Sequence, residues 1–266
     1  MNLPSDNMTP QNRMMGKIYL VNVGANAAHG FASPVFDNRN FEFLPIPEKN
    51  RPQGKNIALY RDLRSFYDPN KDLLKYIPSK LWDEAAHYDP EFDTFTYGDN
   101  CSVTPRSYAL KQVRAGDYIF FLCRLQHWNQ DGPTQSHGFY LVGFLHIQEI
   151  LKEVKSKPSK SIVENYKSNA HVRLALTDPN MWNRFWVFRG SSHSQRFNKA
   201  VPIHRDIAKR LFTTANGSYW KWNPKRTDLQ IIGSYTRSCR CIIDPLKEPD
   251  REKATLMWKW VWQFSR

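Results

Sequence analysis

Residues 116–147, GDYIFFLCRLQHWNQDGPTQSHGFYLVGFLHI, hold two apolar runs joined by a polar segment, and they decide the fold class. The first run covers 118–122 and follows a Gly–Asp turn, and the second covers 139–147. Short aromatic and aliphatic runs bounded by Gly, Pro and Asp are typical of buried β-strands. The polar residues 126–137 therefore predict a hairpin between two core strands.

Other segments along the chain show weaker strand and helix patterns. Further strand candidates are 17–23, 34–36, 41–44, 186–188, 231–232 and 241–243. Helix candidates are 62–84, with proline breaks, 161–168, 205–211 and 251–264. In the last of these, Leu256, Trp260 and Phe264 recur every fourth residue, so this face should cover the core. Many short strands with a few peripheral helices predict an α+β fold built around a compact β-barrel of mixed and antiparallel strands.

Length and composition favour a globular chain. The 266 residues are 41% hydrophobic, and every apolar run is too short to cross a bilayer. Residues 1–14 are polar and lack the apolar centre of a signal peptide, so we expect a disordered leader and a cytoplasmic protein without membrane contact. A single nucleic-acid-binding domain should cover 15–266. The charged segment 152–160 is the one place where a boundary within this domain could lie.

Positive charge is concentrated between residues 181 and 240. This stretch has twelve Lys and Arg against two Asp, which is +10 of the chain's net +13, and it holds ten aromatic residues. Lys and Arg neutralise phosphates, and aromatic rings stack on unpaired bases. A solvated basic face over an aromatic core is the alternative, but it does not require such a charge bias. We therefore expect a nucleic acid as the partner. The expected phosphate-binding residues are Arg189, Ser191, His193, Arg196, Lys199 and Lys221.

An acidic segment interrupts this basic chain between Lys80 and Arg106, which have no Lys or Arg between them. Its acids are Asp83, Glu84, Asp89, Glu91, Asp93 and Asp99. Carboxylates weaken a DNA-binding surface, so their presence suggests a chemical role. Such a role is that of a general base, or of the group that stabilises a cationic intermediate. Asp99, after Gly98 in a tight turn, is the first candidate for a catalytic residue and Asp93 the second. The acids could instead cap helices and pair with the basic half.

A polar cluster follows the 17–23 strand and offers groups that can recognise a base. Amide and imidazole side chains can bond to the Watson–Crick edge of a base that has left the duplex. Aromatic residues of the acidic segment can add stacking surface. The expected base-binding residues are Asn22, Asn26, His29, Tyr97 and Phe95.

No cofactor and no metal site is expected. The four cysteines are scattered without the Cys-x-x-Cys spacing of zinc sites. Cys239 and Cys241 share one face of a strand, but we expect all four to be thiols of a reducing compartment. The chain also lacks the P-loop, the G-x-S-x-G elbow, H-E-x-x-H and the zinc-deaminase pattern. These absences argue against nucleotide hydrolysis, acyl transfer and hydrolytic deamination.

Two blocks, KIYLVNVGANAAHGFASPVF at 17–36 and HYDPEFDTFTYGD at 87–99, resemble the family called nucleotide modification associated domain 3. The likeness extends through RSYALKQVRAGDYIFFLCRL and GFYLVGFLHI, which are also similar to the paired strands of PUA-like barrels, including the EVE and YTH readers of modified bases. The resemblance implies a PUA-like barrel and contact with unusual DNA bases in phage and bacterial modification systems. It assigns no residue roles.

Two functions fit these observations. The first is a DNA glycosylase of antiviral defence, whose partner is double-stranded DNA containing modified bases. It would flip a hypermodified base, such as a glycosylated one, out of foreign DNA and excise it to leave an abasic site. The alternative is a PUA-like or EVE-like reader without chemistry that works with a partner nuclease, or an RNA-binding barrel of the same type. The acidic segment favours the enzyme. An acid beside a base-sized pocket would support chemistry, whereas an aromatic cage would support reading.

Overall fold

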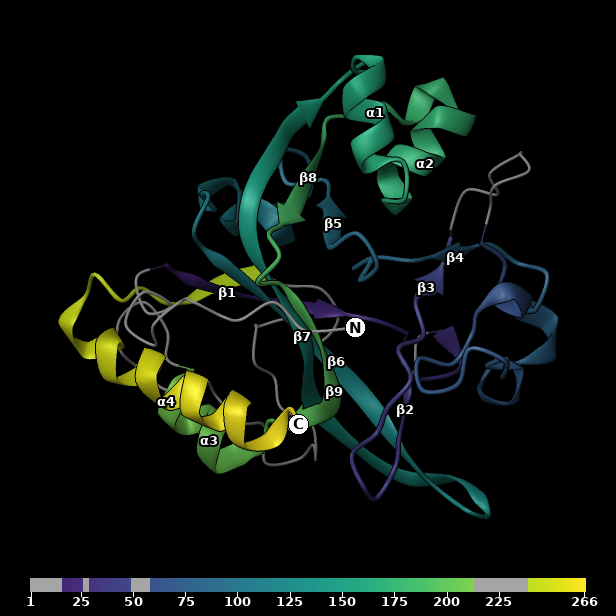
Figure 1. The fold of residues 1–266 in the computed structure, drawn as a ribbon, viewed down its shortest axis with the longest axis vertical. Coiled ribbons are helices and arrows are strands. Elements are labelled where there is room, and N and C mark those ends of the chain that lie inside the picture. The colour runs from purple at the N-terminus through teal and green to yellow at the C-terminus, as the bar shows by residue number, and fades with distance from the viewer. Residues whose placement is uncertain (1–15, 26–28, 49–57, 213–238) are drawn as a thin grey trace.

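The computed structural model describes residues 16–25, 29–48, 58–212 and 239–266 (Figure 1). Its central feature is the antiparallel pair of β6 (Tyr118–Asn129) and β7 (Gly132–Val154), which confirms the predicted hairpin. Both strands run further than the apolar residues alone indicate. Their apolar parts lie in the main core, where side chains such as Phe120 and Leu141 are fully buried.

Eight strands form one mixed sheet around this hairpin. The remaining members are β1 (Ile18–Val23), β2 (Pro34–Val35), β5 (Thr96–Asp99), β8 (Phe185–Gly190), β9 (Gln195–Pro202) and β10 (Cys239–Ile243). The order is β10-β1-β6-β7-β8-β5, with β2 also on β6 and β9 also on β7. β1 runs parallel to β6 and antiparallel to β10. A separate ribbon joins β3 (Ile46–Pro47) to β4 (Ala86–His87).

The long β7 reaches two parts of the sheet because it bends. Its first part pairs with β6 and β9, and its last part pairs with β8, which carries β5 on its other edge. Among the described residues, no pairing joins β5 back to β10, so the sheet path stays open at these strands. The expected α+β class is therefore confirmed, and the expected PUA-like barrel is not.

Four α-helices in the described segments lie around the sheet. They are α1 (Lys160–Tyr166), α2 (Ala170–Thr177), α3 (Arg205–Leu211) and α4 (Glu248–Phe264). In Figure 1, α1 and α2 lie beyond the end of β7 and the start of β8, whereas α3 and α4 lie side by side at the other end of the molecule. The short helices predicted over 161–168 and 205–211 are thus confirmed as α1 and α3.

The C-terminal helix covers the core as predicted, but with a different face. Its buried residues include Ala254, Met257 and Val261, spaced by three and four. Trp258 also turns inward and packs edge-on against the Tyr118 ring, with centroids 5.1 Å apart. The residues expected to face the core lie at its margin and are only partly buried: Leu256, Trp260 and Phe264.

The helix predicted over 62–84 is wrong. The chain forms isolated 3₁₀ turns there: η3 (Tyr60–Asp62), η4 (Leu74–Tyr76) and η5 (Ser79–Leu81). The Asp68 carboxylate accepts the backbone N–H of Asn70, and the Asp72 carboxylate accepts that of Leu74. Such local bonds compete with helical ones, and Pro78 blocks continuation. Two further 3₁₀ segments are η6 (Pro105–Gln112) and η7 (Pro179–Met181).

Three apolar clusters fill the fold. The largest joins the sheet to α3 and α4, the second lies under the 58–88 region, and the third under α1 and α2. None of the helices in the described ranges is long and apolar enough to cross a membrane. The expected leader, 1–14, and the strand expected at 231–232 lie outside the described residues.

Candidate functional site

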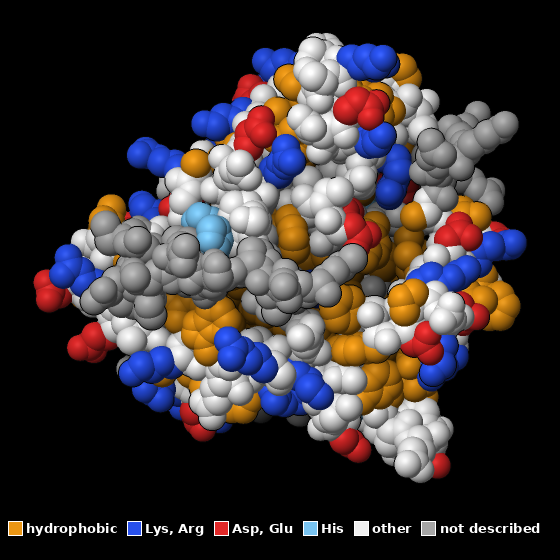
Figure 2. Space-filling model, viewed as in Figure 1, with side chains coloured by type: hydrophobic (Ala, Val, Ile, Leu, Met, Phe, Trp, Pro, Cys, Tyr) orange, Lys and Arg blue, Asp and Glu red, His pale blue; other side chains and the backbone are white. Residues whose placement is uncertain are grey.

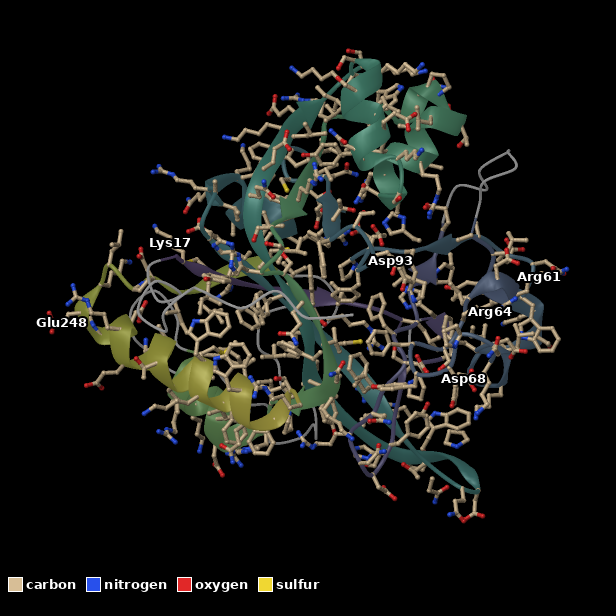
Figure 3. All side chains as sticks on the ribbon, viewed as in Figure 1. Lys17, Arg61, Arg64, Asp68, Asp93 and Glu248 are labelled. Carbon is tan, nitrogen blue, oxygen red and sulfur yellow. The ribbon has the colours of Figure 1, made fainter. Side chains whose placement is uncertain are left out.

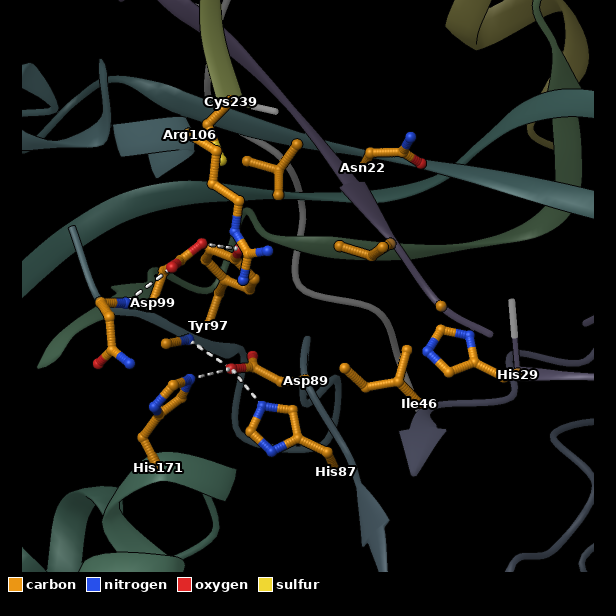
Figure 4. Close-up of a pocket in the computed structure, with 15 residues that line it drawn as sticks. Asn22, His29, Ile46, His87, Asp89, Tyr97, Asp99, Arg106, His171 and Cys239 are labelled. Carbon is orange, nitrogen blue, oxygen red and sulfur yellow. Dashed lines mark hydrogen bonds and ion pairs between the residues drawn. The ribbon is translucent and has the colours of Figure 1, made fainter. Parts of the chain in front are cut away.

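A pocket opens where the end of β1, β4, β5 and the start of α2 meet (Figure 4). One part of its polar lining consists of Asn22, His29, Tyr97, Asp99 and Arg106. The other part consists of His87, Asp89 and His171, which lie close together in the lower half of Figure 4. The pocket therefore combines carboxyl, imidazole, amide, phenol and guanidinium groups in one place.

The end of β1 brings Asn22 and His29 to the pocket. β1 is buried over its first four residues, and the chain then turns at Gly24, whose φ is 82°. A side chain at this glycine would clash with the neighbouring strand, since a Cβ would lie 2.7 Å from the Sγ of Cys123. After the turn, the backbone N–H of Ala25 donates to the carbonyl of Leu44, which holds the loop against the fold.

Asp99 ends β5 and is half-buried. Its carboxylate accepts a hydrogen bond from the Tyr97 hydroxyl at 2.9 Å and another from the backbone N–H of Asn100 at 2.7 Å. Burial, and then the charge of Asp99, raises the pKa of Tyr97 well above its usual range, so the phenol stays protonated and donates. Arg106 from η6 extends toward this pair in Figure 4. Among the described lining residues it is the one Lys or Arg.

Asp89 is the most deeply buried acid of the pocket, with 2% of its side chain exposed. Its Oδ2 accepts the backbone N–H of Gly98 at 2.8 Å and lies 3.9 Å from Nε2 of His87 and 3.6 Å from Nε2 of His171. In the described structure its Oδ1 is buried without a hydrogen-bond partner. Burial raises the pKa of Asp89 well above its usual range, against the lowering effect of the Gly98 bond.

The two histidines face this carboxylate from different elements. His87, in β4, has Nδ1 2.6 Å from a Glu48 carboxylate oxygen. His171, in the first turn of α2, lies edge-on to His87 with ring centroids 5.0 Å apart. Burial, followed by the neighbouring His87, lowers the pKa of His171 to about 3, so this ring is neutral at pH 7. Candidate ligand atoms of His87, Asp89 and His171 all lie within 4.8 Å of one another.

Contacts between α2 and β5 fix the position of His171. Asn169 caps α2 by accepting the backbone N–H of His171 at 3.1 Å, and its amide donates to the Thr96 hydroxyl at 3.3 Å. The ring of His171 then lies against Gly98, where a Cβ would come within 2.3 Å of the ring's Cδ2. The absence of a side chain at position 98 therefore allows this approach.

The structure brings together four of the residues expected to bind the base or catalyse. These are Asn22, His29, Tyr97 and Asp99. Asp93 and Phe95 instead line a second, larger groove between the 58–88 region and the α1–α2 lobe, where Figure 3 shows Asp93. Asn26 lies outside the described residues.

The residues expected to bind phosphate lie away from this pocket. The described ones are Arg189, Ser191, His193, Arg196 and Lys199, and none of them lines it. Arg196 is 8% exposed and lies over the Phe66 ring, 3.5 Å from its centroid. The Ser191 hydroxyl is 2.8 Å from Nδ1 of His146. Lys and Arg side chains are spread over the face shown in Figure 2, and Lys221 lies outside the described residues.

Four residues that line the pocket were not predicted from the sequence as site residues: His87, Asp89, His171 and Arg106. The pair His87 and Asp89 carried a local signal, because residues two apart in an extended segment share a face. His171 carried none, since only the packing of α2 on β5 brings it near. Arg106 is likewise delivered by a 3₁₀ segment, η6, that the sequence did not indicate.

Comparison with known proteins supports the resemblance seen in the sequence. No curated protein and no solved structure matches the chain. The family model described as nucleotide modification associated domain 3 matches residues 17–228, a range that includes all eight polar pocket residues named above. The match spans most of the chain, so the protein belongs to the nucleotide modification associated domain 3 family, whose name points to a role in modified-nucleotide processing.

Proposed function

We propose that this protein binds a modified nucleotide of DNA in the pocket and hydrolyses the bond between its base and deoxyribose. Family membership supports a modified nucleotide as the ligand. The observation that carries the chemical part is the Asp99 carboxylate in a pocket that also holds amide, imidazole and guanidinium groups. Tyr97 is the one Phe, Trp or Tyr among the described lining residues, so an acid rather than an aromatic cage characterises the pocket.

Asp99 has the role of the catalytic carboxylate in this proposal. Cleavage of an N-glycosidic bond passes through a cationic, oxocarbenium-like sugar, which a nearby carboxylate stabilises. Water adds its oxygen to C1′ and gives a proton to Asp99, while the C1′–N bond breaks and its electron pair stays on the base nitrogen, which then takes up a proton. The hydrogen bonds from Tyr97 and Asn100 orient the Asp99 carboxylate.

The other side chains would hold the nucleotide. Asn22, near the end of β1, and His29, in the segment that follows, offer donors and acceptors for the edge of an extruded base. Arg106 offers a planar cation that can bind a phosphate oxygen pair. Extrusion of the base from the duplex costs a few kcal/mol of free energy. This cost is smallest for bases that pair weakly.

The decisive assay uses two DNA samples of the same sequence. One is phage DNA that contains hypermodified bases, and the other is unmodified. Incubation with the full chain should produce alkali-labile abasic sites in the modified DNA alone. The Asp99→Asn variant should lower the rate by about 100-fold or more, with similar DNA affinity. The control variant Asp131→Asn, at the exposed β6–β7 turn, should behave as the wild type.

Each other outcome contradicts part of this proposal. Retained binding without alkali-labile sites would refute the glycosylase and leave a reader that acts with a partner nuclease. Full activity of Asp99→Asn would refute the role of this carboxylate. Equal binding to modified and unmodified DNA would refute recognition of the modification.

A further inference from the structure

We infer that His87, Asp89 and His171 form a binding site for a divalent first-row transition-metal ion such as Zn²⁺. The candidate ligand atoms are Nε2 of His87, a carboxylate oxygen of Asp89 and a ring nitrogen of His171, all within 4.8 Å of one another. This inference does not rest on the proposed function, because metal binding can be measured without DNA.

The spacing of the three groups fits a shared ion better than hydrogen bonds between them. The Asp89 Oδ2 lies 3.9 Å from Nε2 of His87 and 3.6 Å from Nε2 of His171. Hydrogen bonds between nitrogen and oxygen are about 2.7–3.2 Å long, so neither contact is one. Zinc bonds of about 2.0–2.2 Å place tetrahedral ligand atoms about 3.4 Å apart, which small side-chain shifts would reach here.

The surroundings also match those of metal ligands. Metal-binding histidines usually donate their second ring nitrogen to a carboxylate or a carbonyl, which orients the ring. Nδ1 of His87 lies 2.6 Å from a Glu48 carboxylate oxygen, and the ring of His171 packs closely against Gly98, where a Cβ would lie 2.3 Å from its Cδ2. Gly98 in turn donates its N–H to Asp89. Each of the three groups therefore has a partner that holds it in place.

The buried carboxylate supplies an independent argument. Asp89 is 2% exposed, and its Oδ1 has no hydrogen-bond partner in the described structure. A buried polar atom without a partner is costly and rare, so such an atom calls for a missing ligand or proton. A cation that the Asp89 carboxylate bound through both of its oxygens would satisfy Oδ1.

The donor set defines the class of ion. Two imidazoles and one carboxylate suit Zn²⁺, Fe²⁺ and related ions, whereas Mg²⁺ and Ca²⁺ prefer oxygen ligands alone. The side chains of His87 and His171 are 16% and 17% exposed and line the pocket, so ligand positions on that side stay accessible. An ion with an open position can lower the pKa of bound water to about 7. The pocket would then hold a hydroxide at neutral pH.

The test is equilibrium dialysis of the chelator-treated, tag-free full chain against Zn²⁺ and Co²⁺, with bound metal measured by mass spectrometry. The wild type should bind about one ion per chain. A Cys241→Ser background removes the one exposed thiol as a competing ligand. In that background, Asp89→Asn and His171→Ala should each weaken Co²⁺ binding by more than about 100-fold. His127→Ala should not, since this histidine pairs with Tyr140 on the central hairpin.

A positioning role for Glu48 gives a graded control. Glu48→Gln should weaken Co²⁺ binding about 10–100-fold and leave the visible spectrum at saturation unchanged, because the ligands stay the same. Asp89→Asn preserves the shape of the acid, and circular dichroism and thermal melting without metal show whether each variant folds. A wild type that binds no stoichiometric ion overturns the inference. So does a folded Asp89→Asn variant that binds as tightly as the wild type, because the buried acid would then act only as a protonated hydrogen-bonding group.

Discussion

The contact between Gly98 and His171 yields a prediction that can be worked out in magnitude. A Cβ at position 98 would lie 2.3 Å from Cδ2 and 3.0 Å from Cγ of His171, and 3.1 Å from Oδ1 of Asn169. The first distance is far shorter than any real carbon contact, so Gly98→Ala must push the ring away from β5. The ring is mostly buried, and the backbone N–H of His171 is bonded to the capping side chain of Asn169. The ring therefore cannot shift without moving the start of α2.

Two opposing effects set the size of the change. Overfilling a packed site costs about 1–3 kcal/mol of unfolding free energy. Replacing glycine with alanine also stabilises by about 0.4–1 kcal/mol, because the unfolded chain loses freedom. The backbone of Gly98 is not in the left-handed region, so no further strain is added. We expect a net loss of about 1–2 kcal/mol, which corresponds to a fall in Tm of about 2–8 °C for a chain of this size.

The assay is thermal and urea unfolding with a chelator present, so that no metal contributes. The clash between the new methyl group at position 98 and the His171 ring should disappear when the ring is removed. In a His171→Ala background, Gly98→Ala should therefore change stability by less than about 0.5 kcal/mol, and the double-mutant cycle should give a coupling of about 1 kcal/mol or more. Equal losses in both backgrounds, or no loss in either, would refute the packing argument.

Three further predictions concern other parts of the fold. Arg196→Ala should lower the unfolding free energy by about 3 kcal/mol in urea titration, because it removes a buried cation from Glu42, whereas Arg189→Ala should change it by less than about 0.5 kcal/mol. Asp117→Ala should cost about 1–3 kcal/mol by the same measurement, since its carboxylate accepts two backbone N–H groups. In the native protein only Cys241 should react with a maleimide, as read by mass spectrometry. Cys241 is exposed, but partial desolvation of its thiol, followed by the charge of Asp244, raises its pKa to about 11, so the rate should rise about tenfold per pH unit between pH 7 and 9.

The central strands were predictable because their signal is local. The apolar run of β6 needs only neighbouring residues to be recognised, and the polar turn before β7 marks the hairpin. The helix predicted over 62–84 was wrong although its apolar pattern is also local. Its apolar spacing looks helical, but the Asp68 side chain bonds to the nearby backbone and a proline interrupts the pattern. Barrel closure depends on which distant strands pair, and no local pattern specifies that.

The residues of the candidate site also differ in whether a local sequence signal could identify them. Asp99 could be singled out because it ends a strand directly after a glycine, and Asn22 because it lies near the end of a strand that is followed by a glycine turn. Asp89 was counted among the acids without a role, since its burial depends on Gly98 and α2. His171 could not be found at all, because it lies 82 residues beyond Asp89 and meets it only through helix packing.

The arrangement of β5 and β8 separates Arg189 from Asp99. Arg189 pairs with Thr96, and residues directly opposite in an antiparallel pair share a face of the sheet. Thr96 bonds to Asn169 on the α2 side, whereas Asp99, three residues further along β5, belongs to the other face. A nucleotide beside Asp99 would therefore find its nearest cation in Arg106 rather than in Arg189. If the proposed function holds, Arg189 would act on DNA at longer range, so its charge should affect affinity and salt dependence, whereas the pocket should determine which base is chosen.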